Sequence, residues 1–194
     1  PQSLVQRGVR GDDRPMFLNE PETTPETTAL YDHDLADRGW VMNLTHAWAW
    51  RPDLFDSFVA TRALSVAGTG LTDRDVAVLV AATASARGDS YCSLAWGAKL
   101  AGLSSAESAA GVLGGASPDG LTEREHALAD WARHAVTDPS TTTAEEVQRL
   151  RAAGLEHRDI FSATVFLAMR LAFSTVNSAL GLAPDAQLLA DAPD

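Results

Sequence analysis

Cysteine is nearly absent from this chain, which has a single one, Cys92, among 194 residues. One cysteine cannot form a disulfide within the chain, and such low usage is typical of a reducing compartment. A chain of this length hides roughly 70% of its unfolded surface on folding, so its core needs no covalent staple. We therefore expect one principal domain and a cytoplasmic location.

Long apolar runs and positive charge are also scarce. No apolar run reaches the ~18 residues of a membrane span, and the first residues lack a basic segment followed by an apolar one. Lys and Arg total 15 against 26 Asp and Glu, for a net charge of −11. Nucleic acids and anionic membranes are bound mainly through Lys and Arg, so we expect neither as a partner.

Strand patterns and cofactor motifs are missing as well. Residues 76–82 (VAVLVAA) could be a strand in isolation, but their alanines favour a helix. Gly68-Thr69-Gly70 lacks the preceding strand and the further glycine of a phosphate loop. Residues 32–34 (Asp-His-Asp) are adjacent, whereas metal ligands on a helix stand three or four apart. The sequence predicts an all-α fold with no metal and no cofactor.

Residues 71–103 (LTDRDVAVLVAATASARGDSYCSLAWGAKLAGL) carry the clearest pattern, a helix, a short break and a second helix. Thr72 is a plausible N-cap, and Asp75 can complete a capping box with it. The alanine-rich residues that follow predict a largely buried helix. Gly88 ends that helix, because glycine adopts the left-handed C-cap conformation without steric cost.

The second helix of this pair begins at the cysteine. Asp89 or Ser90 can cap it, which places Cys92 in the first turn. There, unpaired backbone N–H groups and the helix dipole favour the thiolate. Asp89, Cys92, Trp96 and Lys99 follow spacings of three, four and three, so they share one face. The alternative is that Cys92 is a small buried apolar residue, the usual state of a free cysteine.

This arrangement resembles the alkylhydroperoxidase-D and carboxymuconolactone decarboxylase family. Peroxidase members of that family carry Cys-x-x-Cys followed by His four residues later, usually with Tyr before the second cysteine. Tyr91 and Cys92 match the motif, whereas Asp89 occupies the first cysteine position and Trp96 the histidine position. The upstream acidic residue of the family would correspond to Asp75 or a neighbour.

The resemblance extends over about residues 40–188. Residues 44–75 are similar to the helix that leads into the family's core, and residues 150–185 to the closing helices of the peroxidase-related subgroup. The resemblance implies an alkylhydroperoxidase-D-like helical bundle. It also implies a homo-oligomer, either a trimer, a hexamer or a dimer.

The rest of the chain divides into an arm, a domain and a tail. Residues 1–28 contain PETTPETT, whose prolines are unsuited to regular structure, so we expect a poorly ordered arm or one that docks on a neighbouring subunit. The domain is expected over residues 29–188, beginning with a helix at Ala29–Arg38, and the tail over residues 189–194.

Two further helices frame the candidate site. The first spans about residues 52–67, and its inward-facing residues are expected to be Leu54, Phe55, Phe58 and Leu64. The second spans about residues 156–180 and carries Arg170 among apolar residues. A buried Arg needs a carboxylate partner, for which Asp75 or an acidic group near Asp89 would serve, unless Arg170 extends to solvent.

These residues support three hypotheses about function. With one cysteine the dithiol peroxidase cycle is impossible within a subunit, and we favour a cofactor-free acid–base enzyme, of decarboxylase, lyase or isomerase type, on a small organic molecule. Its base would be Asp89, Asp75 or His46, and its proton donor Tyr91 or Cys92.

Trp96, Ser93 and Arg170 are the candidate substrate-binding residues of that site, and Trp96 would make it apolar. His46 could instead be a hydrogen-bonded structural histidine. The second hypothesis is a one-cysteine peroxidase-like oxidoreductase, in which Cys92 becomes a sulfenic acid and an external thiol restores it. The third is a non-catalytic oligomeric or ligand-binding member.

Overall fold

The computed structural model describes residues 16–190, and this part of the chain is helical with no β-strand, which confirms the predicted all-α fold. The expectations for residues 1–15 and 191–194 lie outside the described residues. Within residues 16–190 the helices, together with the 3-10 turn η2, are α1 (Pro25–Arg38), α2 (Asn43–Trp48), α3 (Pro52–Val66), α4 (Asp73–Arg87), α5 (Ser90–Leu103), α6 (Ala106–Leu113), α7 (Glu123–Thr137), η2 (Pro139–Thr141), α8 (Ala144–Ala152), α9 (His157–Ala179) and α10 (Ala186–Ala190).

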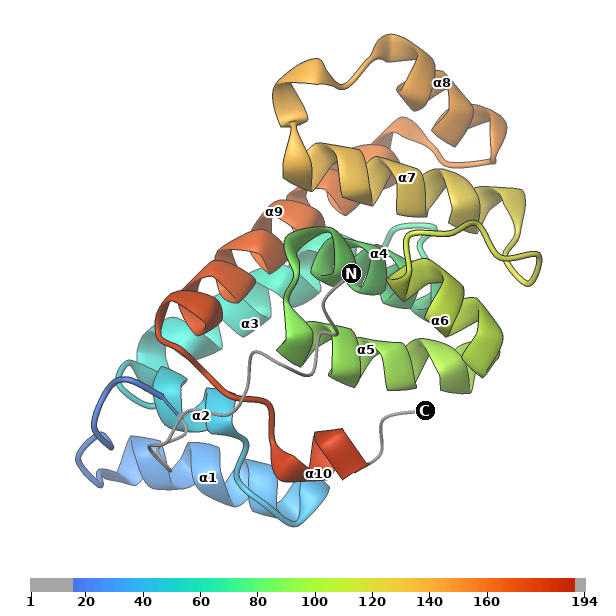
Figure 1. The fold of residues 1–194 in the computed structure, drawn as a ribbon. Coiled ribbons are helices and arrows are strands. Elements are labelled where there is room, and N and C mark those ends of the chain that lie inside the picture. Colours follow the sequence, from blue (N-terminus) through green and yellow to red (C-terminus); the bar gives the residue numbers. More distant parts are fainter. Residues whose placement is uncertain (1–15, 191–194) are drawn as a thin grey trace.

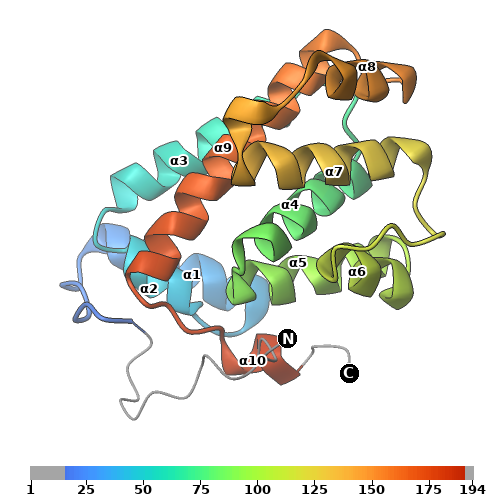
Figure 2. The same ribbon diagram turned by 45° about the horizontal axis from the view of Figure 1, so that its top comes forward.

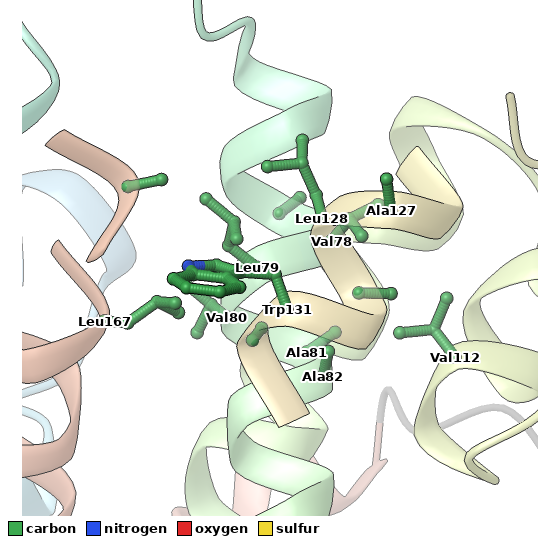
Figure 3. Close-up of a cluster of buried hydrophobic side chains, with 14 of the residues drawn as sticks. Val78, Leu79, Val80, Ala81, Ala82, Val112, Ala127, Leu128, Trp131 and Leu167 are labelled. Carbon is green, nitrogen blue, oxygen red and sulfur yellow. The ribbon is translucent and has the colours of Figure 1, made fainter. Parts of the chain in front are cut away.

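Helix α4 lies at the centre of the bundle, in contact with α5, α6, α7 and α9 (Figures 1 and 2). Each residue from Ala77 to Ala84 is at most 2% exposed, so this helix is buried on all sides. In Figure 3, Val78 and Leu79 of α4 pack beside Leu128 and Trp131 of α7. Small alanines let the neighbouring helices approach α4 closely, which explains why an alanine-rich segment forms the core.

Local capping signals fix most of the helix ends. Thr72, Thr122 and Thr143 each cap a helix and form a capping box with the acidic residue three positions later. Gly88 ends α4 with φ of 65°, in the left-handed region. The capping predictions are therefore confirmed at the break between α4 and α5, which positions the cysteine.

The N-terminal part of the described chain differs from expectation. Helix α1 begins at Pro25 rather than Ala29, because Thr24 and Thr27 form a capping box and proline is compatible with the first helical turn. Before it, the Phe17 N–H donates to the Leu180 carbonyl at 2.9 Å, and Trp50 Nε1 donates to the Asn19 carbonyl at 3.1 Å. Residues 16–24 thus lie against their own chain.

The burial of helix α3 also differs from the prediction. Phe55 and Phe58 each lie 5.4 Å from the Trp48 ring, centroid to centroid, as inward-facing residues should. Leu54 and Leu64, however, are 49% and 73% exposed, and none of the residues of α3 is buried. The helix covers α9 with one side and leaves apolar side chains on the other.

Helix α9 is the longest of the described helices. Its length and mean hydropathy of 1.4 would suffice for a membrane span, and within the described residues it alone meets that test. It packs, however, against α3, α4 and α7, beside which it runs in both ribbon views (Figures 1 and 2). Its buried residues include Arg170, Ser174 and Asn177, which face the cysteine side of the bundle.

Candidate active site

Cys92 lies in the first turn of α5, as the sequence predicts. Asp89 is the N-cap, and its Oδ1 accepts a hydrogen bond from the Cys92 N–H at 2.9 Å. The cysteine is 3% exposed. Because the Asp89 side chain and the first turn fix the backbone on both sides of the thiol, the Sγ atom has a defined position.

Two residues of α9 approach this sulfur. Arg170 Nη2 donates to Cys92 Sγ at 3.1 Å, and the Ser174 hydroxyl lies 3.9 Å from the same atom. Arg170 is 3% exposed, and its Nε has no hydrogen-bond partner within residues 16–190. We expected a carboxylate as the partner of Arg170, but its partner is the Cys92 sulfur, because Arg170 of α9 lies beside the start of α5.

Burial and two charged neighbours are the main influences on the pKa of the thiol. Burial raises the pKa of Cys92 to about 11, Arg170 opposes this by stabilising the thiolate, and the Asp89 carboxylate raises the pKa further. Asp89 Oδ2 is buried and has no hydrogen-bond partner in the described chain. At neutral pH the sulfur is thus a protonated thiol, with a free carboxylate oxygen and a guanidinium group close to it.

Two cations lie against the Trp96 ring beside the cysteine. Lys99 Nζ lies 4.6 Å from the Trp96 ring centroid, and Arg170 Cζ lies 5.5 Å from it. These contacts place Trp96 and Cys92 on the same side of α5, which agrees with the predicted shared face. Ser93 is buried there too, and its N–H donates to the Asp89 carbonyl at 2.9 Å.

Tyr91 links the site to the segment after α9. Its hydroxyl donates a short hydrogen bond to Asp185 Oδ2, and Asp185 Oδ1 accepts from the Asn43 N–H at 2.8 Å. Burial, and next the Asp185 carboxylate, raise the pKa of Tyr91 above its ordinary value. The Asp185 carboxylate therefore joins three segments, and the Tyr91 hydroxyl is occupied as a hydrogen-bond donor to it.

Two predicted site residues lie elsewhere. Asp75 accepts hydrogen bonds from the Thr72 N–H at 2.9 Å and from Arg124 Nε at 3.1 Å, at the opposite end of α4 from Asp89. His46 Nδ1 lies 2.9 Å from a Glu20 carboxylate oxygen. The structure thus brings neither residue to the cysteine.

Four residues near the site were missed. Ser174 and Asn177 stand four and seven positions after Arg170, a helical spacing that could have placed them on its face. Asn177 Oδ1 accepts from Trp48 Nε1 at 2.9 Å. Arg62 of α3 is the third, and its pKa is lowered by burial and next by the positive charge of Arg170. For Asp185 the sequence gives no signal, because it follows the last long helix in an irregular segment.

No metal centre accompanies these residues. Within residues 16–190, no group of three or more His, Cys, Asp or Glu side chains converges as a metal site would require. The site instead combines a buried thiol, a carboxylate oxygen without a partner in the described chain, a guanidinium group and the Trp96 ring. Such a set can transfer a proton and stabilise negative charge on the sulfur or on a ligand.

Comparison of the fold defines the structural class of the chain. Neither a family model nor a curated protein matches the sequence. Solved structures do match over nearly the whole chain, and they share the alkylhydroperoxidase-D-like helical bundle. The chain has this fold, which confirms the fold that the resemblance implies.

Three of these structures show how far the likeness goes. A peroxidase-related protein from Silicibacter sp. TM1040 has a TM-score of 0.80 and 21% identity, over 93% of this chain and 97% of that one. An alkylhydroperoxidase AhpD core protein from Ralstonia eutropha JMP134 has a TM-score of 0.76 and 23% identity, over 90% and 94%. The debrominase Bmp8, as a cysteine-to-alanine variant with 2,3,4-tribromopyrrole, has a TM-score of 0.72 and 17% identity, over 90% and 95%.

Proposed function

We propose that this chain is a peroxidase-related member of the alkylhydroperoxidase-D and carboxymuconolactone decarboxylase family and acts as a one-thiol enzyme on a small molecule. Cys92 is the nucleophile, Asp89 carries its proton, and Arg170 stabilises the negative charge on the sulfur. The observation that carries this proposal is the 3.1 Å contact from Arg170 Nη2 to Cys92 Sγ. A guanidinium group can only donate, so it favours the sulfur as an acceptor.

The chemistry can be written for a peroxide, the simplest electrophile that a thiol reduces. Cys92 Sγ attacks one peroxide oxygen, so that an S–O bond forms as the O–O bond breaks. Asp89 Oδ2 takes the thiol proton and delivers it to the departing oxygen, which leaves as water or an alcohol. The sulfenic acid condenses with an external thiol and releases water, and a second external thiol then restores Cys92 and leaves as a disulfide.

This proposal selects one of the alternatives that the sequence leaves open. An acid–base enzyme centred on Asp89 would not require a cation in contact with the sulfur. A non-catalytic protein would not require a buried carboxylate oxygen without a partner, because such groups destabilise the fold. The debrominase among the structural matches supports catalysis on small molecules by this fold, without indicating a substrate for this chain. An external thiol is available in the cytoplasm, the location we expect.

The test treats the purified protein with hydrogen peroxide in the presence of dimedone, a reagent specific for sulfenic acids. We expect intact-mass analysis to show one dimedone adduct on the wild type and none on Cys92→Ser. An external dithiol added after peroxide, without dimedone, should regenerate the free thiol. A wild-type thiol that peroxide oxidises no faster in the folded than in the urea-unfolded chain would contradict the proposal. Acid–base chemistry at Asp89 would then be the better account.

A further inference from the structure

Two arginine side chains, Arg62 of α3 and Arg170 of α9, lie against the same aromatic ring near the thiol. Arg170 Cζ lies 5.1 Å from the Phe173 ring centroid, and Arg62 Cζ lies 5.9 Å from the same centroid. In residues 16–190, neither guanidinium group has an ion pair with an acidic side chain. Other arginines of this chain are paired, such as Arg124 with Asp75 and Arg149 with Asp130.

This pair of like charges is costly in the free protein. Burial, and next the positive charge of Arg170, lower the pKa of Arg62 from its ordinary value. Arg170 is 3% exposed and its Nε remains without a partner. Unsatisfied buried donors of this kind are rare in folded proteins and call for an explanation.

We propose that Arg62 and Arg170 bind the carboxylate group of an anionic substrate and hold it beside Cys92. Guanidinium groups bind carboxylates through N–H donors, and Arg170 Nε has no hydrogen-bond partner within residues 16–190, so it can supply one. With Asp89 as a carboxylate, the cluster carries one net positive charge, which matches a monoanion better than a dianionic phosphate. This assignment rests on the proposed function of Cys92, whose substrate class it specifies.

The surroundings define the rest of the ligand. Trp48 stacks on Phe173 with centroids 5.2 Å apart, and Phe58 lies 5.8 Å from Phe173. Trp96 lines the same guanidinium group from α5. Asn177 adds a buried Nδ2 without a partner in the described residues. A small carboxylic acid with an apolar body fits these contacts.

The test compares two alkylating reagents that differ only at the proposed recognition group. Iodoacetate and iodoacetamide react with a thiolate by the same displacement, but only iodoacetate carries a carboxylate. The net charge of −11 repels iodoacetate from the molecule as a whole. We nonetheless expect the ratio of the iodoacetate rate to the iodoacetamide rate at Cys92 to be about tenfold higher in the folded chain than in the urea-unfolded chain. One charge-assisted hydrogen bond would give an effect of this size.

Matched variants separate a local site from a general charge effect. Arg62→Gln should abolish the preference for iodoacetate, and Arg62→Lys should retain part of it. Arg149→Gln removes the same charge from an exposed residue of α8 and should leave the preference unchanged. A wild type without the preference, or an Arg62→Gln variant that keeps it, would overturn the proposal.

A second measurement does not depend on a reactive thiol. In Cys92→Ser, iodoacetate binds without reaction, and it should raise the melting temperature more than iodoacetamide at equal concentration. Arg62→Gln in the same background should remove that difference. If Cys92 of the wild type is inert to both reagents but the difference persists, the one-thiol function fails and the carboxylate site stands. If iodoacetamide reacts and the difference is absent, the carboxylate site fails alone.

Discussion

Asp89 stands where a dithiol peroxidase would carry its other cysteine, and its two oxygens have separate environments. Oδ1 caps α5 through the Cys92 N–H, whereas Oδ2 is buried without a partner in the described chain. The cap positions the sulfur, and the free oxygen can exchange a proton with it. Asparagine preserves the cap but removes the carboxylate charge and the proton carrier, so one substitution can distinguish the capping role from the proton-transfer role.

We expect Asp89→Asn to change two reactions of Cys92 in opposite directions. Loss of the carboxylate charge lowers the pKa of the thiol, so alkylation by iodoacetamide at pH 8 should become about threefold to tenfold faster. Oxidation by peroxide should become about a hundredfold slower, because the leaving oxygen loses its proton donor. Both rates are measured by loss of free thiol. A parallel change of the two rates would exclude Asp89 as the proton carrier.

The raised pKa of Cys92 predicts a shifted pH profile. Its value of about 11 lies above the ordinary 9.0 of a cysteine, so the folded chain retains the thiol proton at pH values where an unfolded chain loses it. Alkylation by iodoacetamide should increase with pH through 9 and level off near 11. Serine at position 92 provides the blank. A plateau at pH 9 or below would mean that Arg170 lowers the pKa of the Cys92 thiol by more than burial raises it.

Arg170 should contribute to reactivity at the expense of stability. A buried charge without an opposite charge destabilises the folded state, so Arg170→Met should increase the free energy of unfolding by about 1–3 kcal/mol while slowing alkylation of Cys92. Arg124→Met is the matched control, because it leaves the buried Asp75 unpaired, and it should cost about 3 kcal/mol. Urea unfolding measures both. A loss of stability in Arg170→Met would show that the contact with the Cys92 sulfur outweighs the cost of burying the Arg170 charge.

At the scale of helices, the two ends of α4 have different roles. Asp75 caps the N-terminal end and binds Arg124, whereas the C-terminal end leads into Asp89 and the cysteine. Asp75→Asn should therefore cost about 1–3 kcal/mol of stability through its buried hydrogen bonds. It should leave the peroxide and iodoacetamide rates of Cys92 unchanged. A reactivity change without loss of stability would restore Asp75 as a site residue.

The segment after α9 is fixed to α5 by Tyr91 and Asp185. Tyr91→Phe leaves Asp185 Oδ2 without its phenolic donor, so the free energy of unfolding should fall by about 1–3 kcal/mol. Tyr31→Phe is the control, because the structure gives the Tyr31 hydroxyl no hydrogen bond within residues 16–190. Denaturant titration measures the free energy of unfolding of both variants. Equal stability in both would mean that the Asp185 carboxylate finds another donor.

For the molecule as a whole, the sequence predicted local features such as helix caps better than it predicted contacts between distant helices. Caps such as Thr72 with Asp75 depend on residues three positions apart, so the sequence indicates them directly. The Arg170 contact with Cys92 joins two helices that are distant in the chain, and no local pattern distinguishes a sulfur from a carboxylate as partner. The prediction that Leu54 and Leu64 of α3 are buried was wrong for a related reason. An apolar pattern predicts that a face is covered, but it does not specify by what.

A second copy of the chain that covers the exposed apolar residues of α3 and α9 would explain why α3 has an apolar pattern without being buried. Leu64 near the end of α3 is 73% exposed, Phe161 near the start of α9 is 71% exposed, and Leu54 of α3 is 49% exposed. The two helices are in contact, and Gly70, shortly after α3, donates its N–H to Asp159 of α9. We propose that this face is the interface of a homo-oligomer, since apolar patches of this kind mark association sites.

Charge on this face should then separate the subunits. Leu64→Glu with Phe161→Glu should reduce the mass in light scattering to that of one chain, 20.6 kDa, with about a hundredfold weaker association. Leu103→Glu, at an exposed leucine on α5, should leave the mass unchanged. Since α3 also carries Arg62, dissociation should weaken the preference of Cys92 for iodoacetate. A wild type that is monomeric at every concentration would mean that the face is simply solvated.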